Sequence, residues 1–243
     1  MAETELAPKV VAARSLVEAA YSTLRREILD GTLEPGSKLR FEMLRQRYGF
    51  GASTLREALT RLVGESLVTS EEQRGFRVAE ISLEDVADLT QVRKLIEVEA
   101  LRQSILAGDD AWEANLVAAF HRLSKVEARL PTNRLAEQDA FEDANRAFHM
   151  ALIEACPSRW LKQMHGVLFQ QSERYRRICL CNRVIERDVH AEHAAVMEAV
   201  LARDVERACV LEREHIQRTL DVLKVVFAGQ DAPGGGRGAE QDA

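Results

Sequence analysis

The 243-residue sequence lacks the features of a membrane protein and of a disulfide-stabilised secreted domain. Its longest apolar runs, such as LVAAF, are far shorter than the roughly 18 residues that a membrane-spanning helix needs. Its four cysteines show no regular spacing, and the acidic segment MAETELAPKV lacks the apolar core of a secretory signal. The sequence therefore predicts a reduced, cytoplasmic protein without a membrane anchor.

An excess of positive charge is also missing from the chain as a whole, which has 33 Lys and Arg against 39 Asp and Glu. The balance is nevertheless uneven along the chain. Residues 14–79 hold eleven basic and nine acidic residues, whereas residues 80–227 hold twenty basic and twenty-five acidic residues. A mildly basic part followed by an acidic part indicates two domains with different partners.

Residues 14–79 have the pattern of a winged helix-turn-helix. Apolar residues at helical spacing predict a first helix over 15–30, and segments bounded by glycine predict two more over 41–48 and 53–66. Ser53 is the expected N-cap of the third helix. The strings LVTS and FRVAEI, on either side of the polar turn EEQRG, predict two short strands that form a wing. We expect residues 1–13 to be a flexible leader.

Residues 80–227 show apolar stripes near a 3.6-residue period, which predict helices throughout. The expected ranges are 83–107, 112–129, 135–155, 158–181, 187–202 and 204–227. Short loops between them favour an antiparallel all-α bundle. The Gly-rich tail 228–243 is expected to be disordered. The predicted fold class is therefore mainly α, with an N-terminal winged helix-turn-helix followed by an antiparallel all-α helical bundle.

Several motifs resemble those of GntR-type transcriptional regulators of the FadR branch, in which a winged helix precedes a helical FCD domain. These motifs are LREALTRL, LVTSEEQRGFRVA, VRKLIEVEALR, NRAFHMAL and EHAAVMEAVLARDVERA. The resemblance implies a homodimeric, ligand-responsive repressor of a catabolic operon, which binds an inverted repeat in double-stranded operator DNA. Within the branch, the segment from LTRL to VADLT is similar to repressors of glutarate use that are induced by carbon starvation. This similarity implies a small carboxylate effector, a glutarate-like dicarboxylate.

The resemblance and the chemistry of DNA recognition together select candidate DNA contacts. Arg56, one turn into the third helix, can place its guanidinium on base edges in the major groove. Hydroxyl side chains at the start of this helix can bind phosphate. The full set is Arg40, Arg45, Arg47, Ser53, Thr54, Arg56, Arg74 and Gly75. Gly51 and Ala52 stand where the family commonly has Ser-Arg, and Glu42 replaces a frequent arginine. We therefore expect an operator that differs from the common family sequence.

Three of the six histidines occupy positions at which the resemblance implies metal ligands. His149 follows Asn145 by four residues and shares its helix face, whereas His193 and His215 belong to two other helices. Neutral imidazoles suit zinc or nickel, so the predicted ligands of a divalent metal ion are Asn145, His149, His193 and His215. The family usually has Asp at the position of Asn145. We therefore expect weaker metal binding and a stronger attraction for an anionic effector.

Arg93 matches a family arginine that faces the effector pocket, and Arg174 is a second candidate for holding a carboxylate. Each could instead pair with a glutamate on a helix face. A metal-dependent enzyme with an accessory N-terminal module is the alternative function. However, HAEH is one residue short of the inverted zinc-protease motif, and no Ser-His-Asp or Cys-His arrangement or phosphate-binding glycine loop stands out. A DNA-binding protein without a ligand would leave the histidines unexplained. We therefore expect a regulator and no enzymatic activity.

Overall fold

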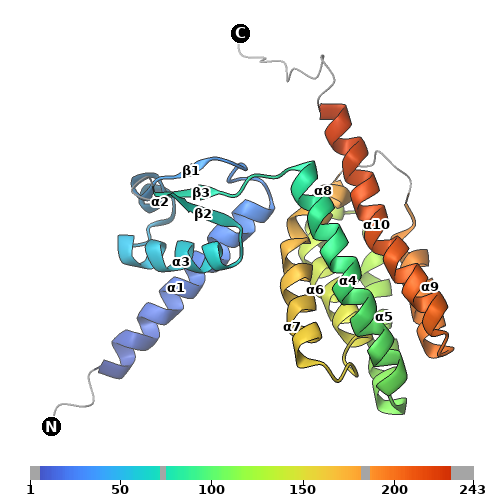
Figure 1. The fold of residues 1–243 in the computed structure, drawn as a ribbon. Helices are drawn as coiled ribbons and strands as arrows, with labels where there is room; N and C mark the ends of the chain where they lie inside the picture. The colour runs from blue at the N-terminus through green and yellow to red at the C-terminus, as the bar shows by residue number, and fades with distance from the viewer. Residues whose placement is uncertain (1–5, 72–74, 182–186, 231–243) are drawn as a thin grey trace. The chain divides into compact units, whose positions relative to one another are not determined.

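The computed structural model describes residues 6–71, 75–181 and 187–230. The chain forms two compact units, one ending at Ser82 and the other beginning at Leu83 (Figure 1). The fold is mainly α with one small sheet, which confirms the predicted fold class. No helix in the described ranges is long and apolar enough to cross a membrane.

The N-terminal unit is a winged helix-turn-helix, coloured blue to cyan-green in Figure 1. Its core is made of fully buried leucines from all three helices, including Leu24, Leu44, Leu55, Leu59 and Leu62. A three-stranded antiparallel sheet has the order β1-β3-β2, with Leu39 paired with Phe76 and Val68 with Val78. The elements are α1 (Leu6–Leu29), β1 (Lys38–Leu39), α2 (Phe41–Tyr48), α3 (Ala52–Gly64), β2 (Val68–Glu71) and β3 (Gly75–Val78).

Two details of this unit differ from the sequence-based expectation. α1 begins at Leu6, so the predicted flexible leader is helical from that residue on, and residues 1–5 lie outside the described ranges. Pro8 does not prevent this, because the first-turn N–H groups of a helix have no intrahelical partner. α3 begins one residue early: Gly51 is its N-cap, without a side-chain capping bond, and Ser53 lies inside the first turn. The prediction of Ser53 as the N-cap was wrong.

The C-terminal unit is a helical bundle built from longer helices. They are α4 (Leu83–Ala107), α5 (Asp110–Glu127), α6 (Arg134–Leu152), α7 (Arg159–Gln171), α8 (Glu173–Cys181), α9 (Val189–Leu201) and α10 (Val205–Gln230). The predicted helix over 158–181 is divided at Ser172, whose hydroxyl donates to the carbonyl of Phe169. Such a side-chain bond can bend a helix, whereas the backbone bonds from Ser172 to Leu168 and from Arg176 to Ser172 are kept at 3.0 Å, so the division is a local distortion. The described part of the predicted tail continues α10 to Gln230, and residues 231–243 lie outside it.

The packing of the bundle brings helices that are distant in the sequence around one polar interior. α10 packs against α4, α8 and α9, while α5 packs against α6 and α9. An apolar core that includes Leu116, Leu123, Phe148 and Val196 occupies one region between them. Beside it lies an unusual number of buried ionisable side chains, which rarely occur in protein cores without a partner. Among them are the histidines that the sequence singled out.

Candidate metal centre and nucleic-acid interface

The helix-turn-helix exposes basic side chains around the junction of α2 and α3. Gly49 ends α2 with a positive φ of 74°, which lets the chain turn into α3 within three residues. Arg56 is exposed on α3 and its guanidinium lies 5.3 Å from the ring centre of Phe41. Arg47 forms an ion pair of 2.9 Å with Glu27. Donors for bases or phosphates are therefore available on the surface of these two helices.

The other predicted DNA contacts also lie in this unit. Arg40, Arg45 and Ser53 are exposed, whereas Thr54 is half-buried. Gly75 is exposed, has a φ of 91° and begins the strand β3, while Arg74 lies outside the described residues. A contact of any of these residues with DNA stays a prediction.

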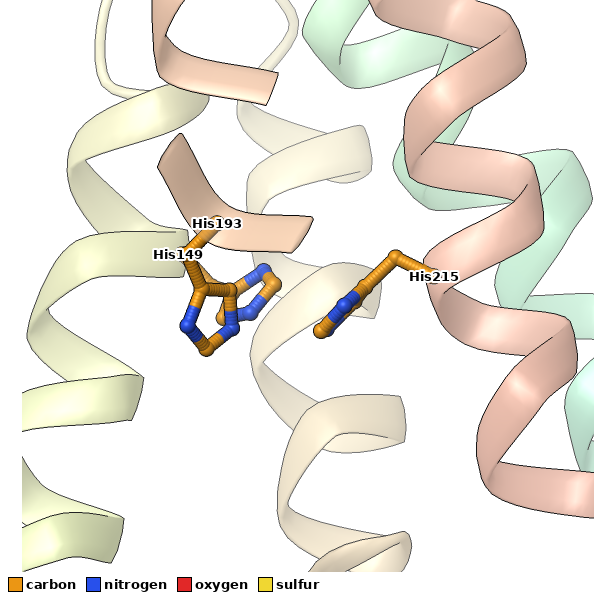
Figure 2. Close-up of side chains that lie close together, drawn as sticks. All are labelled: His149, His193 and His215. Carbon is orange, nitrogen blue, oxygen red and sulfur yellow. The ribbon is translucent and has the colours of Figure 1, made fainter. Parts of the chain in front are cut away.

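His149, His193 and His215 converge inside the C-terminal unit (Figure 2). They come from α6, α9 and α10, and all three side chains are buried. Their ring centres are separated by 5.4 Å (His149–His193), 5.2 Å (His149–His215) and 4.7 Å (His193–His215). One nitrogen from each lies within 4.8 Å of the others. The structure thus brings together three residues that are up to 66 positions apart in the sequence.

Each imidazole of this group directs its Nδ1 atom toward a carboxylate. The pairs are His193–Glu127 at 2.7 Å, His215–Glu192 at 2.8 Å and His149–Glu212 at 3.6 Å. A neutral histidine that donates a hydrogen bond from Nδ1 presents its lone pair at Nε2, the usual arrangement around a metal ion. The Nε2 atom of His193 indeed has no hydrogen-bond partner among the described residues. Sequence reasoning missed the roles of these glutamates.

Burial keeps the imidazoles of His149 and His215 neutral. It lowers the pKa of His215 to about 3 and places the pKa of His149 well below its ordinary value of 6.5. Burial alone would raise the pKa of Glu192, but hydrogen bonds from His215 and Arg187 outweigh it and hold that pKa below its ordinary value. Neutral nitrogen donors supported by ionised carboxylates are a set that suits a divalent transition metal.

Asn145 lies one turn before His149 on α6 and is buried. Its Oδ1 atom has no hydrogen-bond partner in the described part of the chain. A buried polar atom without a partner is rare and points to a missing ion or water. Asp143, by contrast, is exposed on another part of the helix. The Oδ1 atom of Asn145 and the Nε2 atom of His193, both without a hydrogen-bond partner among the described residues, therefore fit a metal ion bound at the three histidines.

A cavity of about 830 Å³ adjoins the histidines and is lined by Asn145, His193 and His215 among others. Its wall also contains three arginines, Arg134, Arg176 and Arg187, and apolar side chains such as Phe141 and Val222. Arg176 pairs with Glu142 at 2.7 Å, and Arg187 pairs with Glu192 at 2.7 Å. The volume and the mixed lining are typical of a site for a small molecule.

The arginines that the sequence selected are placed elsewhere. Within the described residues, Arg93 and Arg174 are not part of the cavity lining. The buried guanidinium of Arg93 makes two hydrogen bonds to Glu97, and that of Arg174 lies 3.7 Å from the carboxylate of Asp85. Sequence reasoning missed Arg134 and Arg176 on their helices and Arg187 just before α9, because arginines on or beside amphipathic helices look alike until the helices are packed.

Comparisons with known proteins agree with this arrangement. The sequence profile "Bacterial regulatory proteins, gntR family" matches residues 16–78, and that of the FCD domain matches residues 88–218. The chain is 44% identical to the HTH-type transcriptional regulator BphR of Paraburkholderia xenovorans (strain LB400), over 87% of the chain and 86% of the relative. It is 37% identical to the HTH-type transcriptional repressor GlaR of Escherichia coli (strain K12), over 86% of the chain and 96% of the relative.

Solved structures show the same fold. E. coli McbR/YncC has a TM-score of 0.68 with 19% identity, covering 87% of this chain and 98% of that one. A GntR family regulator from Pseudomonas syringae pv. tomato str. DC3000 has a TM-score of 0.51 with 24% identity, covering 90% of this chain and 89% of that one. The matched families and relatives are transcription regulators and not enzymes. The chain therefore belongs to the GntR family of bacterial regulatory proteins and carries an FCD domain behind its winged helix-turn-helix.

Proposed function

We propose that the protein is a cytoplasmic repressor of a catabolic operon that responds to a small carboxylate held beside a divalent metal ion. One observation carries this proposal. Three buried imidazoles converge beside a cavity lined by arginines, and each directs Nδ1 toward a carboxylate. The similarity to GlaR, whose name describes a repressor, supports the direction of regulation.

In this proposal Asn145, His149, His193 and His215 hold zinc or nickel. Glu127 and Glu192 fix the orientation of two of the imidazoles through hydrogen bonds of 2.7 and 2.8 Å. The bound ion supplies a Lewis acid at which a carboxylate can bind. Asn145 adds no negative charge, so an incoming anion meets less repulsion than it would from an aspartate at this position.

The arginines of the cavity give the effector its second contact. Arg176 and Arg187 each have five N–H donors. Bonds to Glu142, Phe169 and Ser172 use four donors of Arg176, and bonds to Glu192, Thr219 and the His215 carbonyl use four donors of Arg187, so each arginine keeps one for a ligand. A short dicarboxylate can therefore place one carboxylate near the histidines and the other near an arginine. Glutarate is our first choice among such acids. Because Arg93 and Arg174 lie outside the cavity lining, the proposal assigns the effector contact to Arg176 and Arg187 instead.

The N-terminal unit binds the operator. A homodimer presents two α3 helices to the two halves of an inverted repeat, with Arg56 at base edges and Arg40, Arg45, Arg47, Ser53 and Thr54 near phosphates. Gly75 and Arg74 are the proposed contacts from the wing. Several phosphate contacts imply that operator affinity falls steeply as the salt concentration rises.

The metal centre is tested by elemental analysis of protein purified without chelator. His193→Ala and His215→Ala should each lose one divalent ion per chain relative to the wild type. His121→Ala is the matched control, because His121 is exposed on α5 and should leave the metal content unchanged. A wild-type protein that holds no ion after incubation with zinc and nickel would rule out the centre.

The effector class is tested by thermal melting of the metal-loaded protein against a panel of short carboxylic acids. A ligand at 100 times its Kd stabilises the folded state by about 2.7 kcal/mol, which is a readily measured shift in Tm. Dicarboxylates should shift Tm more than monocarboxylates, and Arg187→Gln should reduce the shift. If sugar acids or monocarboxylates give the larger shift, the dicarboxylate assignment is wrong while the regulator assignment stands.

A further inference from the structure

A second group of buried ligand atoms lies next to the three histidines. Glu97 of α4, His149 of α6 and Glu212 of α10 each offer one atom, and these atoms lie within 4.8 Å of one another. All three side chains are buried, with Glu97 only 1% exposed and Glu212 only 3% exposed. Glu212 precedes His215 by three residues, so both side chains occupy one face of α10.

The two carboxylates of this group differ in how their charge is compensated. Glu97 accepts two hydrogen bonds from the guanidinium of Arg93, which balances its charge. For Glu212, the Oε1 atom lies 3.6 Å from Nδ1 of His149, and the Oε2 atom has no hydrogen-bond partner among the described residues. A buried carboxylate without a partner is strongly unfavourable. Glu212 is therefore the less well compensated of the two carboxylates: Arg93 attracts it electrostatically, but its Oε2 atom accepts no hydrogen bond from the described residues.

The imidazole nitrogen atoms near these carboxylates also lack hydrogen-bond partners among the described residues. Nδ1 of His149 and Nδ1 of His165 have no hydrogen-bond partner in the described part of the chain. Nε2 of His165 lies 3.8 Å from Oε2 of Glu97, at the edge of the group. Nε2 of His149 is on the other edge of its ring. A neutral ring has only one free lone pair, so His149 binds an ion at each group only by releasing its remaining ring proton to solvent and bridging the two ions as an imidazolate. Two carboxylates with an imidazole suit a divalent ion such as Mn²⁺ or Zn²⁺.

We propose that Glu97, His149 and Glu212 form a second divalent-cation site, which shares the imidazole of His149 with the three-histidine site. The ion balances the charge of Glu212 and accepts the free lone pairs of Glu212 and His149. The spacing Glu212-x-x-His215 supports the proposal, because Glu-x-x-His pairs that project into a helical bundle recur in dinuclear carboxylate sites. This site lies beyond the proposed function, which requires only the ion at the three histidines.

Native mass spectrometry of the full chain measures the number of ions directly. After saturation with Zn²⁺ or with Mn²⁺, the wild type should carry two ions per chain. Glu212→Gln, which keeps the shape but removes the charge, should carry one. His193→Ala should also carry one, and its remaining ion should be lost when Glu212→Gln is added. Glu214→Gln is the matched control on the same helix: its side chain is half-exposed and paired with Arg218, so it should retain two ions.

The outcomes separate this proposal from the proposed function. A wild type that binds a single ion, lost in His193→Ala, overturns the second site and leaves the three-histidine centre intact. A single ion that is lost in Glu212→Gln but kept in His193→Ala supports the second site and overturns the first. Two ions that both persist in Glu212→Gln also overturn the assignment. A wild type that binds no ion overturns both sites whatever the variants do, and circular dichroism checks that each variant is folded.

Discussion

Among single residues, Asn145 has the clearest energetic consequence. Its amide oxygen is buried without a partner beside neutral imidazoles, so Asn145→Asp places a negative charge where a cation is expected. The variant should bind Zn²⁺ at least about tenfold more tightly, because one added pairwise attraction of about 1.4 kcal/mol gives this factor. Metal-free Asn145→Asp should be less stable than the wild type, since its carboxylate is buried and uncompensated.

Competition with a fluorescent chelator measures the affinity, and melting with and without chelator measures the stability. The expected pattern is a lower Tm without metal and a higher Tm with it. Asp143→Asn is the control, because Asp143 is exposed on the same helix and its charge is far less effective in water. Equal zinc affinity in the wild type and in Asn145→Asp would exclude Asn145 as a ligand.

The neutral state of His149 and His215 gives the metal-free protein a defined pH dependence. Burial lowers the pKa of His215 to about 3, whereas an unfolded chain protonates histidine near 6.5. As the pH falls from 7 to 5, these histidines bind protons in the unfolded state but not in the folded state. The free energy of unfolding therefore decreases. The loss is on the order of 2 kcal/mol per histidine.

Urea unfolding of metal-free protein at pH 7, 6 and 5 measures this loss. His215→Gln removes one titrating group and should show a shallower decrease. The carboxylate Glu192, whose pKa lies below its ordinary value, affects stability only at lower pH and does not obscure the interval. A free energy of unfolding that stays constant between pH 7 and 5 would contradict the conclusion that His149 and His215 are neutral in the folded protein.

On the DNA-binding unit, Arg56→Ala should weaken operator binding by about 1–3 kcal/mol if its guanidinium contacts a base. Arg56 is exposed on α3 and rests on the ring of Phe41, which limits its range of conformations. Arg61 is a control on the same helix, because its guanidinium pairs with Glu18 at 2.8 Å and lies over the ring of Tyr21. Gel shifts in which Arg56→Ala and Arg61→Ala behave alike would remove Arg56 from base recognition.

At this scale the sequence selected the three histidines that converge, but not the side chains that surround them. His149, His193 and His215 could be selected because their types and positions match a known pattern. Glu127 could not, since it lies on α5, 66 residues before the histidine that it contacts, and one glutamate on a helix resembles another. The same reason explains why Arg93 was selected and Arg176 was not: only packing decides which arginine reaches the cavity.

Among the elements, the turn between α2 and α3 depends on Gly49. Its φ of 74° is a left-handed conformation, and a Cβ atom there would contact nothing within 4 Å. Gly49→Ala should therefore destabilise the unit only through backbone strain, by about 1–2 kcal/mol. Gly64→Ala is the matched control, because Gly64 is helical and equally open, and alanine should be neutral or stabilising there. Thermal melting that shows equal effects for both variants would disprove the argument.

Helix positions were more predictable than helix ends. The range 83–107 agrees with α4 because acidic residues begin it and Gly108 follows it. The interruption at Ser172 was missed, since an apolar stripe continues across it and a single serine is a weak signal. The two-residue strand β1 has no signal of its own in the sequence, because it becomes a strand by pairing with the distant β3. A tertiary contact, which a local pattern does not contain, decides the strand.

For the whole molecule, the two units imply a coupling between effector and operator. Each unit has its own core, and the chain passes from β3 into α4 through four residues. A ligand weakens DNA binding only if it binds more tightly to the form of the protein that does not match the operator. Half-sites must lie about one helical turn apart, so a few ångströms of change between the α3 helices are sufficient.

We therefore expect glutarate to weaken operator binding about a hundredfold, which requires a preference of about 3 kcal/mol for the released form. Gel shifts on metal-loaded protein measure this change, and calorimetry on the same sample measures glutarate binding. Linkage demands that operator DNA lower the affinity for glutarate by the same factor. His193→Ala should still bind the operator but should not respond to glutarate. If glutarate binds and the operator affinity stays constant, glutarate is not the effector, because a ligand that favours neither form shifts no equilibrium.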